Sequence, residues 1–342
     1  MARAKEASFG KRNIEVENHW QKLETKDFKI NRPTMICLGG NGTIDERKAN
    51  NFCKMAERLM SLRLDSTNDY SSFRNFDVLG FSYGVEKDGD TVGQFNSDDH
   101  CDIVSNLLIP LCVDNNGKRL SLAEACKNFS MLSFFTHCQG AKELNNIMGV
   151  AKKQMLIKGF SQEEITNIMS HSFQATYSPI QDEIYVPTVR VDSFTDSLHM
   201  GMSRIYRETY GHKLNGVNIF YEPARTFRNQ PSGYTHQDLL YIYSSRLLNT
   251  TENTDLRNIR DEHYATGIIE MDKNWNNVSG AVNAEVVSKM LGYAMALNGA
   301  RQISAYINED FSPISLGTLK TDLDDILAGY NKEDLEAKTS PN

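Results

Sequence analysis

Residues 131–148 have the sequence MLSFFTHCQGAKELNNIM, and this stretch carries the strongest structural signal in the chain. A short apolar run comes first, and a polar turn centred on Cys138 follows it. Ala141, Leu144 and Ile147 then recur at helical spacing. The pattern predicts a strand, a sharp turn and a helix. A thiol at such a turn would stand out of the sheet above a helix N-terminus, where the partial positive charge favours a thiolate or an oxyanion.

This turn resembles the nucleophile elbow of the α/β-hydrolase superfamily. The family pattern is Gly-x-Ser-x-Gly at a strand-to-helix turn, and the chain has Thr136-His137-Cys138-Gln139-Gly140. Threonine replaces the first glycine, and cysteine replaces serine, which changes the chemistry of the nucleophile rather than its geometry. The resemblance implies an α/β fold with a mostly parallel central sheet, helices on both faces and Cys138 as the nucleophile.

Length and composition are those of an ordinary globular protein. The chain has 342 residues, of which 40% are hydrophobic and 24% are charged, enough for one large α/β domain with additions or for two domains. The net charge of -7 argues against a nucleic-acid partner, which would need a basic face. No apolar run reaches the roughly 18 residues that would predict a membrane span.

The six cysteines contain no CxxC pair, so they suggest neither a zinc site nor a thioredoxin-type site. They fall within segments that resemble strands or helices, as reduced thiols would. We therefore expect a reducing compartment, the cytoplasm, and neither a metal nor another cofactor.

A second turn between a predicted strand and a predicted helix lies upstream. Thr34–Leu38 is apolar and predicts a buried strand, and the glycine-rich turn from Gly39 to Thr43 follows it directly. The resemblance implies that this turn supplies one oxyanion N–H, from Gly40 or Asn41, and that Gln139 supplies the other. A phosphate loop is an alternative, although the Lys-Ser/Thr ending of a P-loop is absent. An ordinary tight turn is another.

The literal Gly-x-Ser-x-Gly pattern occurs elsewhere, at Gly80-Phe81-Ser82-Tyr83-Gly84. Residues 85–90, which follow it, lack helical periodicity and contain turn signals. The pattern has functional meaning only where a strand passes through a turn into a helix. We therefore interpret Ser82 as the end of a neighbouring strand and keep it as a weaker candidate nucleophile that could line the mouth of the site.

The candidate acid of a catalytic triad lies in the β-rich run of residues 186–196. In α/β hydrolases the acid commonly lies in a loop about nine residues after a proline that begins a strand. That offset from Pro187 gives Asp196. Asp192 is a weaker candidate because it should lie inside the strand. The structural alternative for Asp196 is an N-cap of the next helix.

The candidate base is His236, in a loop after the predicted strand Gly216–Tyr221 and just before a predicted helix. The resemblance places the base at such a position. The chain order Cys138, Asp196, His236 is then the nucleophile, acid, histidine order of the family. His199 and His263 are weaker candidates, and a solvated loop histidine is the structural alternative for His236.

Helix signals complete the outline of the chain. Capping boxes predict helix starts at Ser121 and Ser161, and an apolar helix over residues 282–297 is expected to stop at Gly299. Four segments are expected: a polar N-terminal arm or peripheral helix (1–30), an α/β-hydrolase-like core (31–249), a C-terminal helical extension or lid (250–332) and a polar tail (333–342).

The sequence thus predicts a hydrolase that acts on an ester, thioester or amide carbonyl of a small-molecule or acyl substrate. Two other classes stay open. One is a non-catalytic α/β scaffold that binds a ligand or a protein partner, with Cys138 as a structural residue. The other is a phosphate- or nucleotide-binding protein that uses the turn from Gly39 to Thr43.

Overall fold

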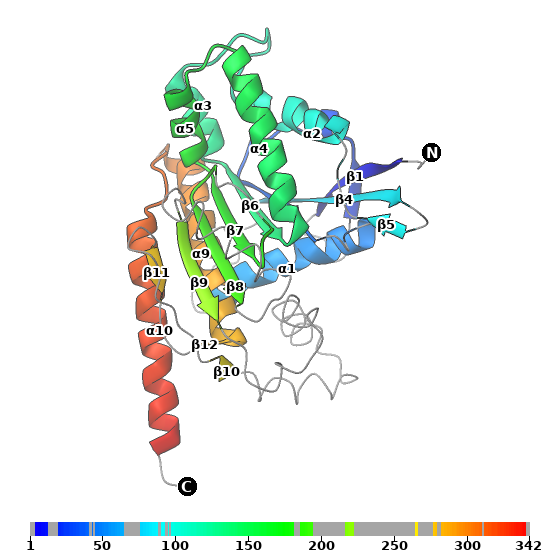
Figure 1. The fold of residues 1–342 in the computed structure, drawn as a ribbon. Helices are drawn as coiled ribbons and strands as arrows, with labels where there is room; N and C mark the ends of the chain where they lie inside the picture. The colour runs from blue at the N-terminus through cyan, green and yellow to red at the C-terminus, as the bar shows by residue number, and fades with distance from the viewer. Residues whose placement is uncertain are drawn as a thin grey trace.

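A computed structural model describes most of the chain (Figure 1). The described residues are 4–12, 20–40, 43, 45–64, 76–87, 90–92, 95, 97–180, 185–193, 216–221, 264–265, 276–278, 282–309 and 311–339. Within them, a central β-sheet carries helices on both of its faces.

The central sheet has ten strands in the order β11-β9-β8-β7-β6-β3-β4-β1-β2, and β5 pairs with β4 beside this path. The strands are β1 (Ala4–Arg12), β2 (Trp20–Leu23), β3 (Thr34–Leu38), β4 (Asp77–Lys87), β5 (Asp90–Val92), β6 (Leu132–His137), β7 (Phe173–Tyr177), β8 (Thr188–Ser193), β9 (Gly216–Tyr221) and β11 (Asn276–Val278). All pairs from β11 to β4 are parallel, whereas β1, β2 and β5 run antiparallel to their neighbours. The predicted mostly parallel sheet is therefore confirmed.

A short separate sheet pairs β10 (Tyr264–Ala265) with β12 (Val282–Asn283). The helices are α1 (Glu46–Leu64), α2 (Ser97–Ile103), α3 (Leu122–Phe129), α4 (Gln139–Ile157), α5 (Gln162–Ser170), α9 (Ala284–Asn308) and α10 (Leu316–Thr339). A π-helical turn over Val104–Leu108 and a 3-10 turn over Ile109–Leu111 continue α2. The spacing of Ile103, Val104, Leu107 and Leu108 predicts a single helix over residues 98–113, whereas the structure divides this segment into three parts.

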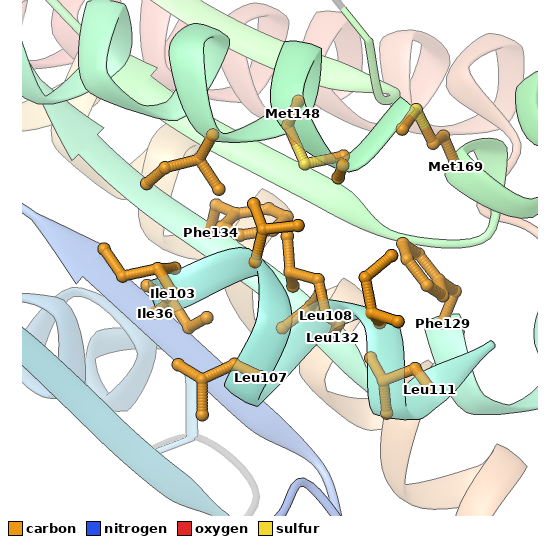
Figure 2. Close-up of a cluster of buried hydrophobic side chains, with 14 of the residues drawn as sticks. Ile36, Ile103, Leu107, Leu108, Leu111, Phe129, Leu132, Phe134, Met148 and Met169 are labelled. Atoms are coloured by element: carbon orange, nitrogen blue, oxygen red, sulfur yellow. The ribbon is translucent and has the colours of Figure 1, made fainter. Parts of the chain in front are cut away.

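Alternate residues of the buried strands serve two different cores, as the period of a strand requires. Met35 and Cys37 of β3 pack into one cluster with α1, α9 and α10. Ile36 and Leu38 of the same strand pack into the other, with α2 to α5. Figure 2 shows this second cluster, in which Phe134 of β6 and Met148 of α4 point toward one another.

The N-terminal segment is not an arm or a peripheral helix, because it adds β1 and β2 to the edge of the sheet. Lys11 of β1 pairs with the buried Asp77 of β4 at 2.5 Å, and Arg32 holds the same carboxylate. Trp20 of β2 packs against the apolar core. Both strands contain several charged or polar residues and no apolar run, so the composition of this segment did not indicate strands.

The C-terminal region also differs from the expected extension or lid. Helix α9 runs through Gly299 to Asn308, and its apolar face lies in the core with α1. A Cβ at Gly292 would lie 2.2 Å from the carbonyl oxygen of Leu59, so α9 and α1 approach closely. Gly292 thus allows the two helices to pack closely, and Gly299 lies inside α9 rather than ending it. Helix α10 reaches Thr339, which makes most of the expected tail helical.

Several elements agree with the sequence in detail. Strands β3 and β9 have the predicted bounds. Both capping boxes are present. The side chains of Ser121 and Ser161 each accept a hydrogen bond from the backbone N–H of the glutamate three residues on, and the backbone N–H of each serine donates to that glutamate's carboxylate. These local signals succeed because they depend only on neighbours within one helical turn.

Candidate active site

The site lies where the chain changes direction within the sheet. From β3 the chain passes to β4 on one side, and it later returns as β6 on the other side of β3. The carboxyl ends of β3 and β6 therefore lie side by side, and α/β sheets place ligands outside such a switch point. The turn from Gly39 follows β3, and Cys138 follows β6.

Cys138 lies at the junction of a strand and a helix, as predicted. Strand β6 ends at His137, and α4 begins at Gln139. The backbone of Cys138 has φ 51° and ψ -121°, a conformation that residues other than glycine rarely adopt. Strain of this kind costs on the order of 1–3 kcal/mol and persists only where the surrounding structure imposes it. Cys138 is 8% exposed.

The loop after β7 holds the strained residue on both sides. The backbone N–H of Cys138 donates to the carbonyl of Ser178 at 3.1 Å, and the N–H of Ile180 donates to the carbonyl of Cys138 at 3.0 Å. Ser178 itself has a positive φ of 42°. Because its own N–H is engaged in this way, Cys138 cannot offer that N–H to a ligand.

Two glycines bring the elbow and the upstream turn into contact. A Cβ at Gly140 would lie 2.0 Å from the carbonyl oxygen of Leu38, so the first turn of α4 packs directly on the backbone at the end of β3. A Cβ at Gly40 would lie 2.9 Å from Nδ1 of His137 and 3.2 Å from Cβ of Cys138. Only glycine permits backbones to approach so closely. The structure thus brings Gly40 and Gln139, two predicted oxyanion donors, together beside Cys138.

Thr136 replaces the first glycine of the family pattern, and its hydroxyl is used inside the sheet. It donates to the hydroxyl of Thr176 on β7 at 2.7 Å and accepts from Nε2 of Gln174 at 2.9 Å. Thr136 and Thr176 are register partners and are both buried. A buried hydroxyl with two partners carries little desolvation cost, which accounts for a threonine at this position.

A buried carboxyl group lies behind the elbow, and sequence reasoning missed it. Glu143 of α4 is fully buried. One of its oxygens accepts from Nε2 of Gln139 at 2.7 Å, and the other lies 2.7 Å from Nε2 of His100 on α2. These partners satisfy a carboxylate that would otherwise be costly to bury. The i, i+4 spacing of Gln139 and Glu143 was the one available signal.

Ser82 lies within β4, which continues to Lys87 and then pairs with the antiparallel β5. It is therefore not at the end of a strand, and no helix follows it. Asp192 lies inside β8 as expected, in register with Phe220 of β9. The other predicted site residues lie outside the described residues: Asn41, Asp196, His199, His236 and His263.

The cysteines on the α1 and α3 sides of the sheet are chemically distinct from a surface thiol. Burial raises the pKa of Cys112 to about 12 and raises that of Cys126. Burial, together with a hydrogen bond to Cys53, also raises the pKa of Cys37. Such thiols stay protonated and unreactive in the folded protein.

In the part of the chain that the structure describes, no group of three or more His, Cys, Asp or Glu side chains is arranged to hold a metal ion. None of its helices is long and apolar enough to cross a membrane.

Comparisons with known proteins give a weak structural likeness. No protein-family model matches the chain, and no curated protein matches it in sequence. Among solved structures, the crystal structure of a dienelactone hydrolase from Anabaena variabilis ATCC 29413 aligns with 72% of this chain and 97% of its own, at 10% sequence identity and a TM-score of 0.30. A TM-score of this size is too low to establish a shared fold or a shared activity.

Proposed function

We propose that this chain is a hydrolase in which the thiolate of Cys138 attacks an ester, thioester or amide carbonyl. The proposal rests on one observation. A cysteine with φ 51° and ψ -121° lies between a parallel strand and a helix N-terminus, with the backbone of Gly40 against it. A residue other than glycine keeps such strain most often at functional sites.

In the proposed reaction, His236 takes the proton from Cys138, and Asp196 fixes the tautomer of the imidazole. A bond forms between Sγ and the carbonyl carbon. The bond to the leaving group then breaks as His236 returns the proton to it. Water, activated by the same histidine, cleaves the resulting thioester, so that the acid product leaves and the thiol is restored.

Two backbone N–H groups would stabilise the tetrahedral oxyanion. Gln139 is the first residue of α4, so its N–H has no acceptor within the helix. Gly40 provides the second N–H from the facing turn. Removal of one donor of this kind typically costs about 3 kcal/mol of transition-state stabilisation.

The test is direct detection of the acyl-enzyme. The protein is mixed with 4-nitrophenyl acetate, quenched in acid within milliseconds to seconds, and examined by peptide mass spectrometry. We expect one acetyl group, located on Cys138, to appear and then decay as 4-nitrophenolate is released. Cys138→Ala should show neither step.

The identity of the base is tested by alkylation. Brief treatment of the native protein with iodoacetamide should label Cys138 faster than the exposed Cys101, and His236→Ala should remove that advantage. If Cys138 stays unlabelled until the protein unfolds, the nucleophile hypothesis fails. The binding-scaffold hypothesis would then be preferred, and thermal stabilisation by a nucleotide would support the phosphate-binding alternative.

A further inference from the structure

Tyr83 of β4 holds the turn after β3 at two points. Its hydroxyl donates to the carbonyl oxygen of Gly39. Its backbone N–H donates to the carbonyl oxygen of Thr43 at 3.0 Å, and the N–H of Thr43 donates in turn to the carbonyl oxygen of Gly40 at 2.9 Å. One residue on a neighbouring strand therefore fixes both ends of the turn that faces the elbow.

The contact with Gly39 determines the direction of an oxyanion donor. The carbonyl of Gly39 and the N–H of Gly40 belong to the same peptide unit, which is planar and trans. In such a unit the C=O and N–H bonds point in opposite directions. A hydroxyl that fixes the carbonyl of Gly39 therefore also fixes the orientation of the Gly40 N–H, on the residue that lies against Cys138.

The phenol is well suited to stay in place. Tyr83 is 1% exposed, and its ring packs against Phe95 with the ring centroids 4.5 Å apart. Phe95 in turn meets the ring of His100, the partner of Glu143. Burial raises the pKa of Tyr83 well above its usual value, and electrostatic interactions with Glu143 and Cys138 raise it further. The hydroxyl thus remains a neutral donor at physiological pH.

We propose that Tyr83 is a positioning residue of the oxyanion hole, which orients the Gly40 N–H by holding the Gly39 carbonyl. Tyr83 itself touches neither the substrate nor the reacting atoms. This inference rests on the proposed hydrolase function and adds a specific residue to it. It also gives a role to the literal motif around Ser82, because Tyr83 is the residue next to that serine.

The experiment compares two reactions of the same thiol in Tyr83→Phe, in the full chain. Acylation by 4-nitrophenyl acetate passes through an oxyanion, whereas alkylation by iodoacetamide does not. We expect kcat/KM for the ester to fall about 10-fold to 100-fold, mainly through kcat, because a donor aimed only at the transition state is lost. The rate of alkylation of Cys138 should stay within about 2-fold of the wild-type rate.

Two further variants separate positioning from folding. Tyr293→Phe removes a phenol hydroxyl that donates to Asp322 at 3.0 Å in the contact between α9 and α10, and we expect it to leave both reactions unchanged. Incorporation of 4-aminophenylalanine at position 83 keeps a neutral donor at the same place on the ring. It should restore most of the ester rate, and it serves as the folded variant if Tyr83→Phe does not fold.

The outcomes distinguish failure of the role of Tyr83 from failure of the hydrolase proposal. Equal losses in acylation and alkylation, or no loss in either, would overturn the role of Tyr83 while leaving the hydrolase proposal intact. The role of Tyr83 would also be overturned if the 4-aminophenylalanine variant folds but hydrolyses the ester no faster than Tyr83→Phe. If Tyr83→Phe does not fold, a folded 4-aminophenylalanine variant without ester activity would have the same meaning. If the wild-type protein alkylates at Cys138 but never acylates, the proposed function fails and this inference fails with it.

Discussion

Two five-residue motifs, one on each side of β3, lie in different structural settings. Gly80-Phe81-Ser82-Tyr83-Gly84 matches the hydrolase pattern letter for letter, yet it lies inside β4, which continues to Lys87. Thr136-His137-Cys138-Gln139-Gly140 departs from the pattern at two positions, yet its central residue has the positive φ of a strand-to-helix turn. The difference shows that the next element of the chain, rather than the identity of the residues, determines whether the central residue of such a motif lies at a strand-to-helix turn.

The glycines of the two motifs show the same contrast. Added bulk at Gly140 would meet the backbone carbonyls of Leu38 and Gly39. Added bulk at Gly80 would meet the side chains of Cys53 and Trp20. One glycine lets two segments of backbone touch, whereas the other makes room for side chains that can shift.

The largest expected effect is on activity at the two central residues. Cys138→Ala should lower the turnover of 4-nitrophenyl acetate about 10⁴-fold or more, because the nucleophile is removed. Ser82→Ala should stay within about 3-fold of wild type. Steady-state kinetics on both variants, with circular dichroism to check folding, would make this comparison. A large loss in Ser82→Ala with Cys138→Ala still active would reverse the assignment.

The next effect is on thiol reactivity and its dependence on pH. Cys112 has a pKa of about 12, so its thiolate fraction at pH 8 should be about 10³-fold below that of an ordinary thiol. The folded state holds the Cys112 proton more tightly than the unfolded state does. The contribution of this thiol to the free energy of unfolding is therefore complete below about pH 9 and is lost as the pH rises through about 12. Iodoacetamide labelling between pH 7 and 10 should modify Cys101 and Cys138 and spare Cys112. Early labelling of Cys112 would contradict the buried environment.

A smaller effect is expected on stability at the two glycines. Gly140→Ala forces a Cβ to within 2.0 Å of a backbone oxygen, and we expect it to lower the free energy of unfolding by about 3 kcal/mol. Gly80→Ala should cost about 1–2 kcal/mol, because side chains can move aside. Urea titration of both variants would measure the difference. Equal losses would mean that the contact between α4 and β3 is looser than described.

The smallest effect is expected when alanine is replaced by glycine at the two central positions, where the free energy of unfolding should change in opposite directions. Relative to alanine, glycine at position 138 should raise the free energy of unfolding by about 1 kcal/mol, because glycine adopts φ 51° and ψ -121° without strain. Relative to alanine, glycine at position 82 should lower it by about 0.5–1 kcal/mol, because this site is extended strand. Thermal denaturation of the four variants would test this, and the same sign at both positions would argue against a strained elbow.

Local signals in the sequence predicted much of the sheet and several helix ends. The apolar run Thr34–Leu38, the capping box at Ser161 and the helical spacing after Gln139 each depend on residues close together in the chain. Strands β1 and β2 were missed because they contain several charged or polar residues and no apolar run. The expected stop at Gly299 was wrong because the contact between α9 and α1 outweighs the low helix propensity of glycine.

The sequence by itself determined many of the elements and the place of the elbow, because periodicity and turn chemistry act within a few residues. It placed Gly40, Gln139 and Cys138 in candidate roles without showing that they meet. Only the tertiary structure decided the strand order that sets the ends of β3 and β6 side by side. It also decided two hydrogen bonds between residues far apart in the chain. One joins the hydroxyl of Tyr83 to the carbonyl of Gly39 across 44 residues, and the other joins the N–H of Cys138 to the carbonyl of Ser178 across 40. Such contacts join distant residues through their packing in the folded chain, and no local pattern encodes them.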